Sequence, residues 1–361
     1  MPVKTSAPGR ICLFGEHQDF LGLSVIATAI DLDVRISGTP RDDTRFSISM
    51  PDLSTTPEAD YDEFDATEQL DYRGSRDYLH SAVNVLRREG LPIRCGYDCE
   101  VRGTIPMNAG TSSSSAFTVA WVTFLLSTQN GELIHEPEYI AKLGYLTEVK
   151  EFNEPGGMMD HYTSAIGGLL HIDCQEPITA TPLQAKLDGF VLGNTHEPKN
   201  TTHTLRESRE ATNAGVAMLA EKIPGFDLRT TPMEQAAEFF GEMPPDIRRR
   251  AKANFINRDL CQEAHRMLSA DEVDKARLGE MLYEHQVQLR DGIGVSHPKL
   301  DKLVDAAMSA GALGGKLNGS GCGGCMFAYA PGKQEQVAKA ITQAGGTAYI
   351  VTLRDGVRVN N

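Results

Sequence analysis

A run of small residues in the first third of the chain is the strongest candidate for a chemical role. It reads PMNAGTSSSS and stands between an expected strand at 101–105 and an apolar stretch, AFTVAWVTFLL, that is typical of a buried helix. Free backbone N–H groups at the start of a helix attract phosphate, and small side chains allow close approach. The hydroxyls that can donate to phosphate oxygens or reach a metal ion belong to Ser112, Ser113, Ser114 and Ser115. This order predicts a phosphate site, and a serine-rich helix cap without a ligand is the alternative.

Several other chemistries lack their usual sequence patterns. The chain contains no GxxxxGK[ST] loop, no GxGxxG dinucleotide pattern with a distant acidic residue, and no GxSxG elbow of a hydrolase. Cys322 and Cys325 form a CxxC, but both intervening residues are glycine and no second pair lies near. These two cysteines are therefore interpreted as small residues in a tight turn.

The elements that must position the serine run are mixed helices and strands. Residues 11–36 predict strands joined by a loop at 15–22, which carries two carboxylates and an imidazole. Helices are expected at 75–89 and 137–151, and the second precedes the glycine pair of EPGGMMDHYTSAIGG.

The second half of the chain has a strand pattern at 190–194, several helices between 204 and 310, and a glycine cluster, GGKLNGSGCGGC, before the strand MFAYA. A helix at 334–344 and a strand at 347–353 are expected to follow. Helices and strands do not alternate regularly, so an α+β fold is favoured over a doubly wound parallel sheet.

Bulk composition narrows the function classes. A chain of 361 residues predicts two domains or one two-lobed domain. Its net charge of −14 disfavours nucleic-acid and membrane-surface partners, and the longest apolar stretch is too short for a bilayer span. Seven cysteines without a disulfide framework's density predict reduced thiols and a cytoplasmic location. An anionic ligand would have to be held by backbone dipoles and a bound cation.

Five motifs, in order along the chain, resemble those of the GHMP kinases, the superfamily of galactokinase, homoserine kinase, mevalonate kinase and phosphomevalonate kinase. PMNAGTSSSSA is similar to the family's phosphate loop, PxxxGLxSSAA. APGRICLFGEHQDFLG combines features of the first mevalonate kinase motif and of the galactokinase signature. The other three are EPGGMMDHYTSAIGG, LGEMLYEHQVQLRDGIGVSHPKLDKLV and the late glycine loop KLNGSGCGGCMFAYA.

The resemblance implies a two-lobed α+β fold. The N-terminal lobe, 1–182, would be similar to domain 2 of ribosomal protein S5, and the C-terminal lobe, 183–361, would be ferredoxin-like. The implied activity is ATP- and Mg²⁺-dependent phosphorylation of a small molecule. A monosaccharide is the expected acceptor and its anomeric hydroxyl the expected position.

The resemblance also implies roles for individual residues. Asp160 falls on the catalytic aspartate, which would orient or deprotonate the acceptor hydroxyl. Arg10 should pair with Asp160 and neutralise charge on the moving phosphoryl group. Glu148 and Ser114 fall on the magnesium ligands. The expected ATP-binding residues are Pro106, Gly110, Ser112, Ser113, Ser114, Ser115, Gly319 and Gly321.

Glu16, His17 and Asp19 match the galactokinase residues that hydrogen-bond sugar hydroxyls, and Gly157 is expected beside the substrate. Mevalonate kinases share the Glu-His pair but lack the aspartate, so Asp19 favours a polyhydroxylated acceptor. The remaining histidines considered lack ligand spacing and are expected to be structural: His161, His171, His203, His285 and His297.

Three alternatives stay open at this point. Cys12, Phe14 and Phe20 replace the Asn, Ile and Tyr of the galactokinase signature, so the acceptor could be a heptose, fucose, arabinose, a uronic acid or a cyclic polyol. APGR and LFGEH would suit a mevalonate-type kinase for an acyclic alcohol. A catalytically inactive sensor of sugar and ATP is the third. The sequence indicates no oligomeric state.

Overall fold

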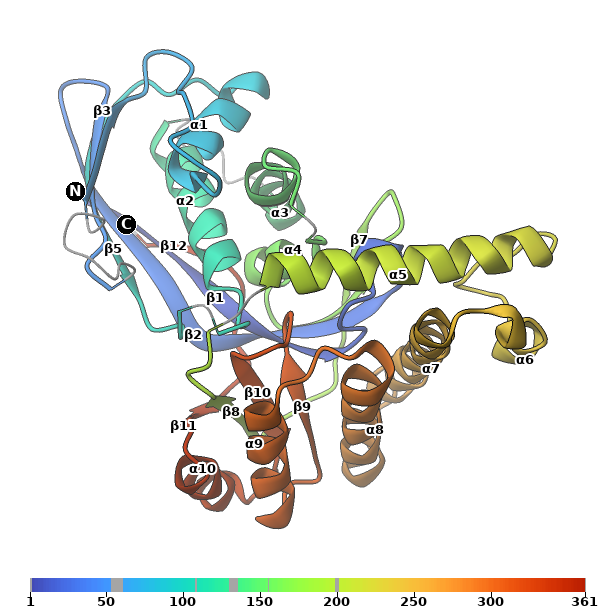
Figure 1. Cartoon of the computed structure of the whole chain (residues 1–361). Helices are drawn as coiled ribbons and strands as arrows, with labels where there is room; N and C mark the ends of the chain where they lie inside the picture. Colours follow the sequence, from blue (N-terminus) through green and yellow to red (C-terminus); the bar gives the residue numbers. More distant parts are fainter. Residues whose placement is uncertain are drawn as a thin grey trace.

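The computed structural model describes residues 2–52, 61–107, 109–129, 136–154, 156–198 and 201–360, except for the side chains of 201–205. Two β-sheets, each covered by helices, form two lobes that meet at the end of a long hairpin (Figure 1). The predicted α+β class is confirmed.

The first sheet is built on that hairpin. Strands β1 (Val3–Phe14) and β2 (Val25–Pro40) pair antiparallel, and the loop between them holds a short 3-10 turn, η1 (Asp19–Leu21). The sheet order is β12-β1-β2-β5-β3-β4. Strand β6 also pairs with β2, and β7 pairs with β6. The other strands are β3 (Arg45–Ser49), β4 (Tyr61–Asp65), β5 (Tyr97–Gly103), β6 (Leu169–Asp173), β7 (Thr179–Pro182) and β12 (Arg358–Asn360).

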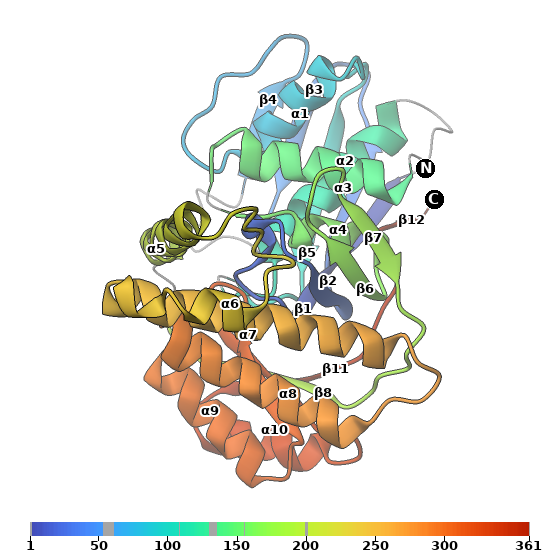
Figure 2. The ribbon, with the colours of Figure 1, turned by 90° about the vertical axis from the view of Figure 1, so that its right-hand side faces the viewer.

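Four helices cover one face of this sheet (Figures 1 and 2). The central one, α2 (Ser113–Gln129), is apolar around most of its circumference and packs on β1 and β2, as a helix buried on all sides should. Its Trp121 is fully buried and stacks on Phe124. The others are α1 (Tyr78–Arg88), α3 (Pro137–Tyr145), which runs into the π-helical turn η3 (Leu146–Lys150), and α4 (Met159–Ile166).

The second sheet has four antiparallel strands in the order β11-β8-β10-β9. They are β8 (Phe190–Asn194), β9 (Gly314–Asn318), β10 (Cys325–Tyr329) and β11 (Thr347–Val351). Its helices are α7 (Pro245–Leu268), α8 (Lys275–Val287), the π-helical turn η5 (Gln288–Ile293), α9 (Pro298–Ser309) and α10 (Gln334–Gln343).

Strand β9 occupies the start of what the sequence analysis treated as a glycine cluster. A Cβ on Gly314 would lie 2.0 Å from the carbonyl oxygen of Gly279 on α8. The glycines therefore let a helix lie directly on the strand, which explains a strand made of residues with poor strand propensity.

A helical arm projects from the second lobe (Figure 1). It consists of α5 (Thr201–Lys222), which packs on α7, followed by α6 (Met233–Ala237) and the 3-10 turn η4 (Phe240–Glu242). No helix within the described residues is both long and apolar enough to cross a membrane.

The C-terminal segment returns to the first sheet. Strand β12 pairs with β1, and Arg354 donates hydrogen bonds to buried Asp33 and, at 3.0 Å, to Ser6. The division into lobes at 182/183 stays a prediction. The first sheet draws its strands from before that point, apart from β12.

Candidate active site

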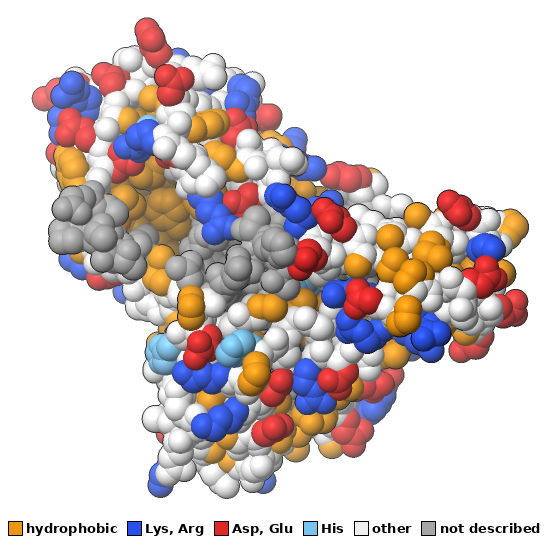
Figure 3. All heavy atoms as spheres, in the orientation of Figure 1, with side chains coloured by type: hydrophobic (Ala, Val, Ile, Leu, Met, Phe, Trp, Pro, Cys, Tyr) orange, Lys and Arg blue, Asp and Glu red, His pale blue; other side chains and the backbone are white. Residues whose placement is uncertain are grey.

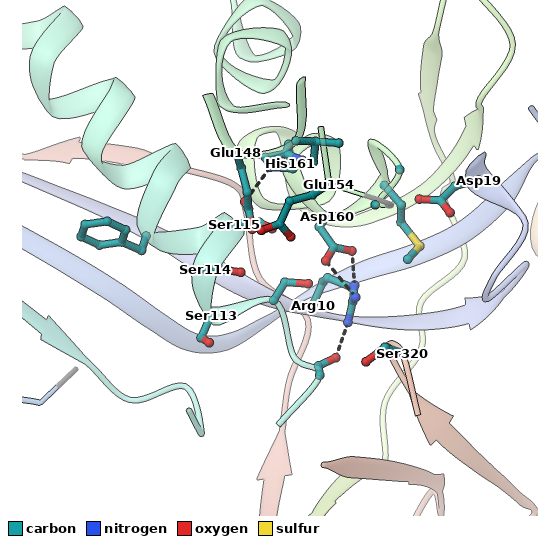
Figure 4. Close-up of a pocket in the computed structure, with 18 of the residues that line it drawn as sticks. Arg10, Asp19, Ser113, Ser114, Ser115, Glu148, Glu154, Asp160, His161 and Ser320 are labelled. Carbon is teal, nitrogen blue, oxygen red and sulfur yellow. Dashed lines mark hydrogen bonds and ion pairs between the residues drawn. The ribbon is translucent and has the colours of Figure 1, made fainter. Parts of the chain in front are cut away.

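A pocket of about 460 Å³ lies where the two lobes meet (Figure 4). Its walls come from β1 and the loop after it, the start of α2, η3, the start of α4 and the late glycine loop after β9. It brings together thirteen of the predicted residues: Arg10, Glu16, His17, Asp19, Gly110, Ser112, Ser113, Ser114, Ser115, Glu148, Gly157, Asp160 and Gly319.

Two predicted residues do not line this pocket. Pro106 is buried at the base of the phosphate loop, and Gly321 backs onto the carbonyl oxygen of Val295, 2.0 Å from where a Cβ would stand. Both residues contribute to the backbone conformation and packing of their loops.

The predicted pair of Arg10 and Asp160 is present. Arg10 Nε and Nη2 donate to the two carboxylate oxygens at 2.7 and 3.0 Å, and Nη1 donates to the Gly110 carbonyl oxygen at 2.6 Å. Burial alone would raise the pKa of Asp160, but the Arg10 charge holds that pKa below its usual value. Asp160 is therefore ionised at neutral pH, and its side chain remains 27% exposed towards the pocket.

The phosphate loop adopts the backbone conformation of an anion site. Gly110 and Ser112 both have positive φ, and α2 begins at Ser113, so the first N–H groups of a long helix point at the pocket. The hydroxyls of Thr111 and Ser112 are buried and make no hydrogen bond of good geometry within the described part of the chain, although Ser112 lies close enough to Asp160 to help lower its pKa. Buried polar atoms are rarely left unpaired, so these hydroxyls fit a bound phosphate.

The late glycine loop packs against the phosphate loop. A Cβ on Gly319 would lie 2.6 Å from the Gly110 carbonyl oxygen, and the Cys325 N–H donates to the Ala109 carbonyl at 2.6 Å. Asn318 joins both loops to β1, because it accepts from the Cys12 N–H at 2.9 Å and donates to Gly110 at 2.8 Å. The sequence analysis missed Asn318, whose partners lie more than 200 residues away.

Glu148 lies in the pocket wall on η3. Its Oε2 accepts a hydrogen bond from His161 Nε2 at 2.7 Å, and both side chains are more than 90% buried. His161 was expected to be structural, yet it lines the pocket. Beside them Glu154 is paired with Arg76 at 2.7 Å.

Three of the other histidines that were expected to be structural do not line the pocket. His171 stacks on His265, His285 is buried against Phe14, and His297 caps α9. The side chain of His203 lies outside the described residues.

The loop after β1 forms the opposite end of the pocket, near Ser320 (Figure 4). Glu16 Oε2 accepts from Lys316 Nζ at 2.8 Å, and Lys316 is fully buried. His17 has positive φ, and burial lowers its pKa, so the ring stays neutral. Its nitrogens are buried and make no hydrogen bond of good geometry among the residues described, although the backbone of Gly319 and Ser320 lies close to the ring.

Asp19 faces both Gly157 and the catalytic candidate Asp160. A Cβ at position 157 would lie 1.9 Å from Asp19 Oδ2, so glycine is required there for Asp19 to occupy its place. Burial, reinforced by the negative charge of Asp160, raises the pKa of Asp19 to about 6. Asp19 thus changes charge near neutral pH.

The pocket also has an apolar end, formed by Met50, Met107 and Phe117. Hydrophobic side chains gather in a hollow of the upper lobe on the face shown in Figure 3. The site thus combines an apolar wall, a phosphate loop and a polar end.

Comparisons with known proteins agree with this geometry. The model of the GHMP kinases N terminal domain matches residues 77–168, that of GHMP kinases C terminal matches 269–350, and the galactokinase galactose-binding signature matches 2–40. Mevalonate kinase of Pyrococcus abyssi is 32% identical over 99% of this chain and 97% of its own length. The chain belongs to the GHMP kinase family. Galactokinase of Pasteurella multocida is 29% identical over 98% of this chain and 94% of its own.

Solved structures show the same fold. The crystal structure of Lactococcus lactis galactokinase complexed with galactose covers 99% of this chain and 95% of its own, with a TM-score of 0.85 at 22% identity. A crystal structure of mevalonate kinase has a TM-score of 0.71 at 19% identity and covers 98% of this chain and 99% of its own. This GHMP kinase is therefore an ATP-dependent enzyme that phosphorylates a hydroxyl group of a small molecule.

The buried pair of Lys316 and Glu16 yields a stability prediction. Lys316→Met should lower the free energy of unfolding by about 3 kcal/mol or more, because it leaves an unpaired buried carboxylate. The double variant Lys316→Met/Glu16→Gln should recover most of that loss. Urea unfolding of the three proteins measures the difference, and a double variant no more stable than Lys316→Met would contradict the pairing.

Proposed function

We propose that this GHMP kinase transfers the terminal phosphoryl group of ATP to a hydroxyl, most favourably the anomeric one, of a neutral monosaccharide. The carrying observation is the position of Asp160. Arg10 holds its carboxylate between the serines of the phosphate loop and Asp19 (Figure 4), and Asp19 forms a polar end of the pocket together with Glu16 and His17. An acceptor at the polar end would place a hydroxyl between Asp160 and the phosphate.

In this proposal Asp160 accepts or orients the proton of the acceptor hydroxyl, and Arg10 stabilises negative charge on the transferred group. Arginine cannot act as a base, so its part is electrostatic. Because Arg10 lowers the pKa of Asp160, this carboxylate is a weak base. Most of the catalysis would therefore come from positioning and charge neutralisation.

ATP would lie along the start of α2. The phosphates would bind the N–H groups of Gly110 and Ser112 to Ser115 and approach Gly319, while the apolar end would take the base. Small side chains and positive φ at Gly110 and Gly319 permit that approach.

Magnesium fits the donor set at Glu148 and Ser114. No group of three or more His, Cys, Asp or Glu side chains suited to a metal occurs among the residues described, so a metal here would depend on ATP oxygens as well. Mg²⁺ is commonly bound in this way, by one or two protein ligands together with phosphates and waters. When bound it would supply positive charge at the phosphates.

The charge of the polar end supports a neutral acceptor. Glu16 is neutralised by Lys316, but Asp19 forms no ion pair with any of the described residues and lies close to the Asp160 charge. A carboxylate on the acceptor would be repelled there. The neutral His17 ring and the two carboxylates suit a dense set of hydroxyls.

A mevalonate-type kinase is the second candidate, supported by the 32% identical relative. An ADP-release screen over hexoses, pentoses, heptoses, uronic acids, polyols and mevalonate separates the two. We expect turnover with a neutral sugar and an acid-labile product without reducing power. Turnover with mevalonate alone would overturn the sugar proposal, and so would a lack of turnover with every sugar in the panel.

Asp160→Asn should lower kcat at least about 100-fold, because the amide cannot accept the proton. The Kd for ATP should change less than about threefold, because the Asp160 carboxylate contacts Arg10 and the Ser112 side chain rather than the N–H groups at the start of α2 that would hold the phosphates. A steady-state ADP-release assay measures kcat, and calorimetry measures the Kd for ATP. Asp355→Asn, an exposed change outside the pocket, is the control and should behave as wild type. Full activity of Asp160→Asn would exclude the assigned role.

Asp19 should set an acid limb in the pH profile. It loses its charge as pH falls through about 6, so kcat/KM for the acceptor should fall about tenfold between pH 7 and pH 5. The pKa of Asp160 is lowered, so Asp160 would not produce this limb. Asp19→Asn should have a lower kcat/KM at pH 7 and a flat profile. A limb that persists unchanged in Asp19→Asn would rule out this assignment.

A further inference from the structure

Glu148 is held by one neighbour on the next helix. Its Oε2 receives the Nε2–H of His161 at 2.7 Å, and the exposed fractions of the two side chains are 9% and 1% (Figure 4). No hydrogen bond to its second oxygen, Oε1, is found within the described part of the chain. One oxygen of the carboxylate is therefore fixed, and the other is available to a ligand in the pocket.

Arg76, which also lines the pocket, is already engaged. It donates from Nε and Nη2 to Glu154 at 2.7 and 3.2 Å, so its attraction to Glu148 acts through space and not through a hydrogen bond. A carboxylate buried to this degree is costly without a hydrogen-bond donor or a cation. His161 supplies the donor, and the pocket leaves room for the cation.

His161 also links Glu148 to Asp160. Asp160 and His161 are consecutive residues in the first turn of α4, and their side chains diverge. Asp160 contacts Arg10 on β1, and His161 contacts Glu148 on η3. The hydrogen bond from His161 therefore ties Glu148 to the helical turn that carries Asp160.

We infer that His161 is a positioning residue, which orients Glu148 so that Oε1 faces the divalent cation bound with ATP. This inference rests on the proposed metal site. Ligating carboxylates are commonly held by such an outer hydrogen bond, and its loss typically weakens metal binding 10- to 100-fold. The hydrogen bond to a carboxylate requires the proton on Nε2, and the buried Nδ1 has no partner among the described residues.

The competing interpretation is that the pair only fastens η3 to α4. The ring packs against Tyr145 with centroids 5.9 Å apart and against Gly144, where a Cβ would lie 3.2 Å from His161 Cδ2. Such a role would affect stability and leave the metal dependence of ATP binding unchanged.

Two amide substitutions separate these interpretations. His161→Gln can place its amide nitrogen near the former Nε2 and keep the donor, whereas His161→Asn places it near the former Nδ1 and cannot reach Glu148. Calorimetry gives the Kd for ATP with and without Mg²⁺, and electron paramagnetic resonance gives the Mn²⁺ affinity of the ATP complex.

We expect His161→Asn to weaken Mn²⁺ binding at least about tenfold and to reduce the Mg²⁺ enhancement of ATP affinity by a similar factor. His161→Gln should stay within about threefold of wild type, and the Kd for metal-free ATP should be unchanged in both.

Thr163→Val is the matched control. Thr163 is fully buried in α4 and donates to the Met159 carbonyl at 2.8 Å, so its loss disturbs the same helix without touching Glu148. It should lower the unfolding midpoint and keep the metal coupling. Equal metal coupling in wild type, His161→Asn and Thr163→Val would overturn the inference.

A double variant covers the case in which His161→Asn alone is too unstable to assay. Glu148→Gln should lose metal coupling, and adding His161→Asn should cause no further loss, since the two act as one unit and the double variant no longer buries an unpaired carboxylate. Independent, additive losses would overturn the inference. If wild type itself shows no metal enhancement of ATP binding, the proposed metal site fails, which is distinct from failure of the His161 role.

Discussion

The guanidinium group of Arg10 is the contact on which the rest of the site depends. It binds both oxygens of Asp160 and the Gly110 carbonyl, so one planar group sets the aspartate relative to the phosphate loop. Its own backbone is held on both sides, because its N–H donates to the Thr111 carbonyl and its carbonyl accepts from Asn318. A buried charge persists only when its donors are satisfied, so the strand, the loop and α4 must come together for the fold to form.

Close backbone approach is the second constraint. Gly9 lies where a Cβ would meet the Thr111 carbonyl oxygen at 2.7 Å, and Gly319 is as close to Gly110. Gly157 leaves space for Asp19 in the same way. Side chains at these positions would push apart the segments whose functional groups must converge. The glycines that the motifs contain are therefore geometric requirements of the pocket, and only some of them face a ligand.

Much of this could be predicted from the sequence because motifs carry local geometry. The buried helix after the serine run, the strand at 190–194 and the pairing of Arg10 with Asp160 are confirmed. Lys316 and Asn318 were missed because their partners lie more than 200 residues away, and spacing along the chain says nothing of such contacts. Strand β9 was missed because its glycines serve helix packing. The roles of the site residues remain proposals.

The charges in the pocket explain why a cation would be needed for the reaction. Among the described residues that line it, the two arginines are each taken by a carboxylate, Arg10 by Asp160 and Arg76 by Glu154. Lys316 behind the wall is likewise taken by Glu16. Glu148 and Asp19 remain, so the site is acidic before any ligand enters, in a protein with a net charge of −14. Helix dipoles offset only part of the charge of a triphosphate. A divalent cation at Glu148 would reverse the local sign, and its position would then decide where the phosphate can sit.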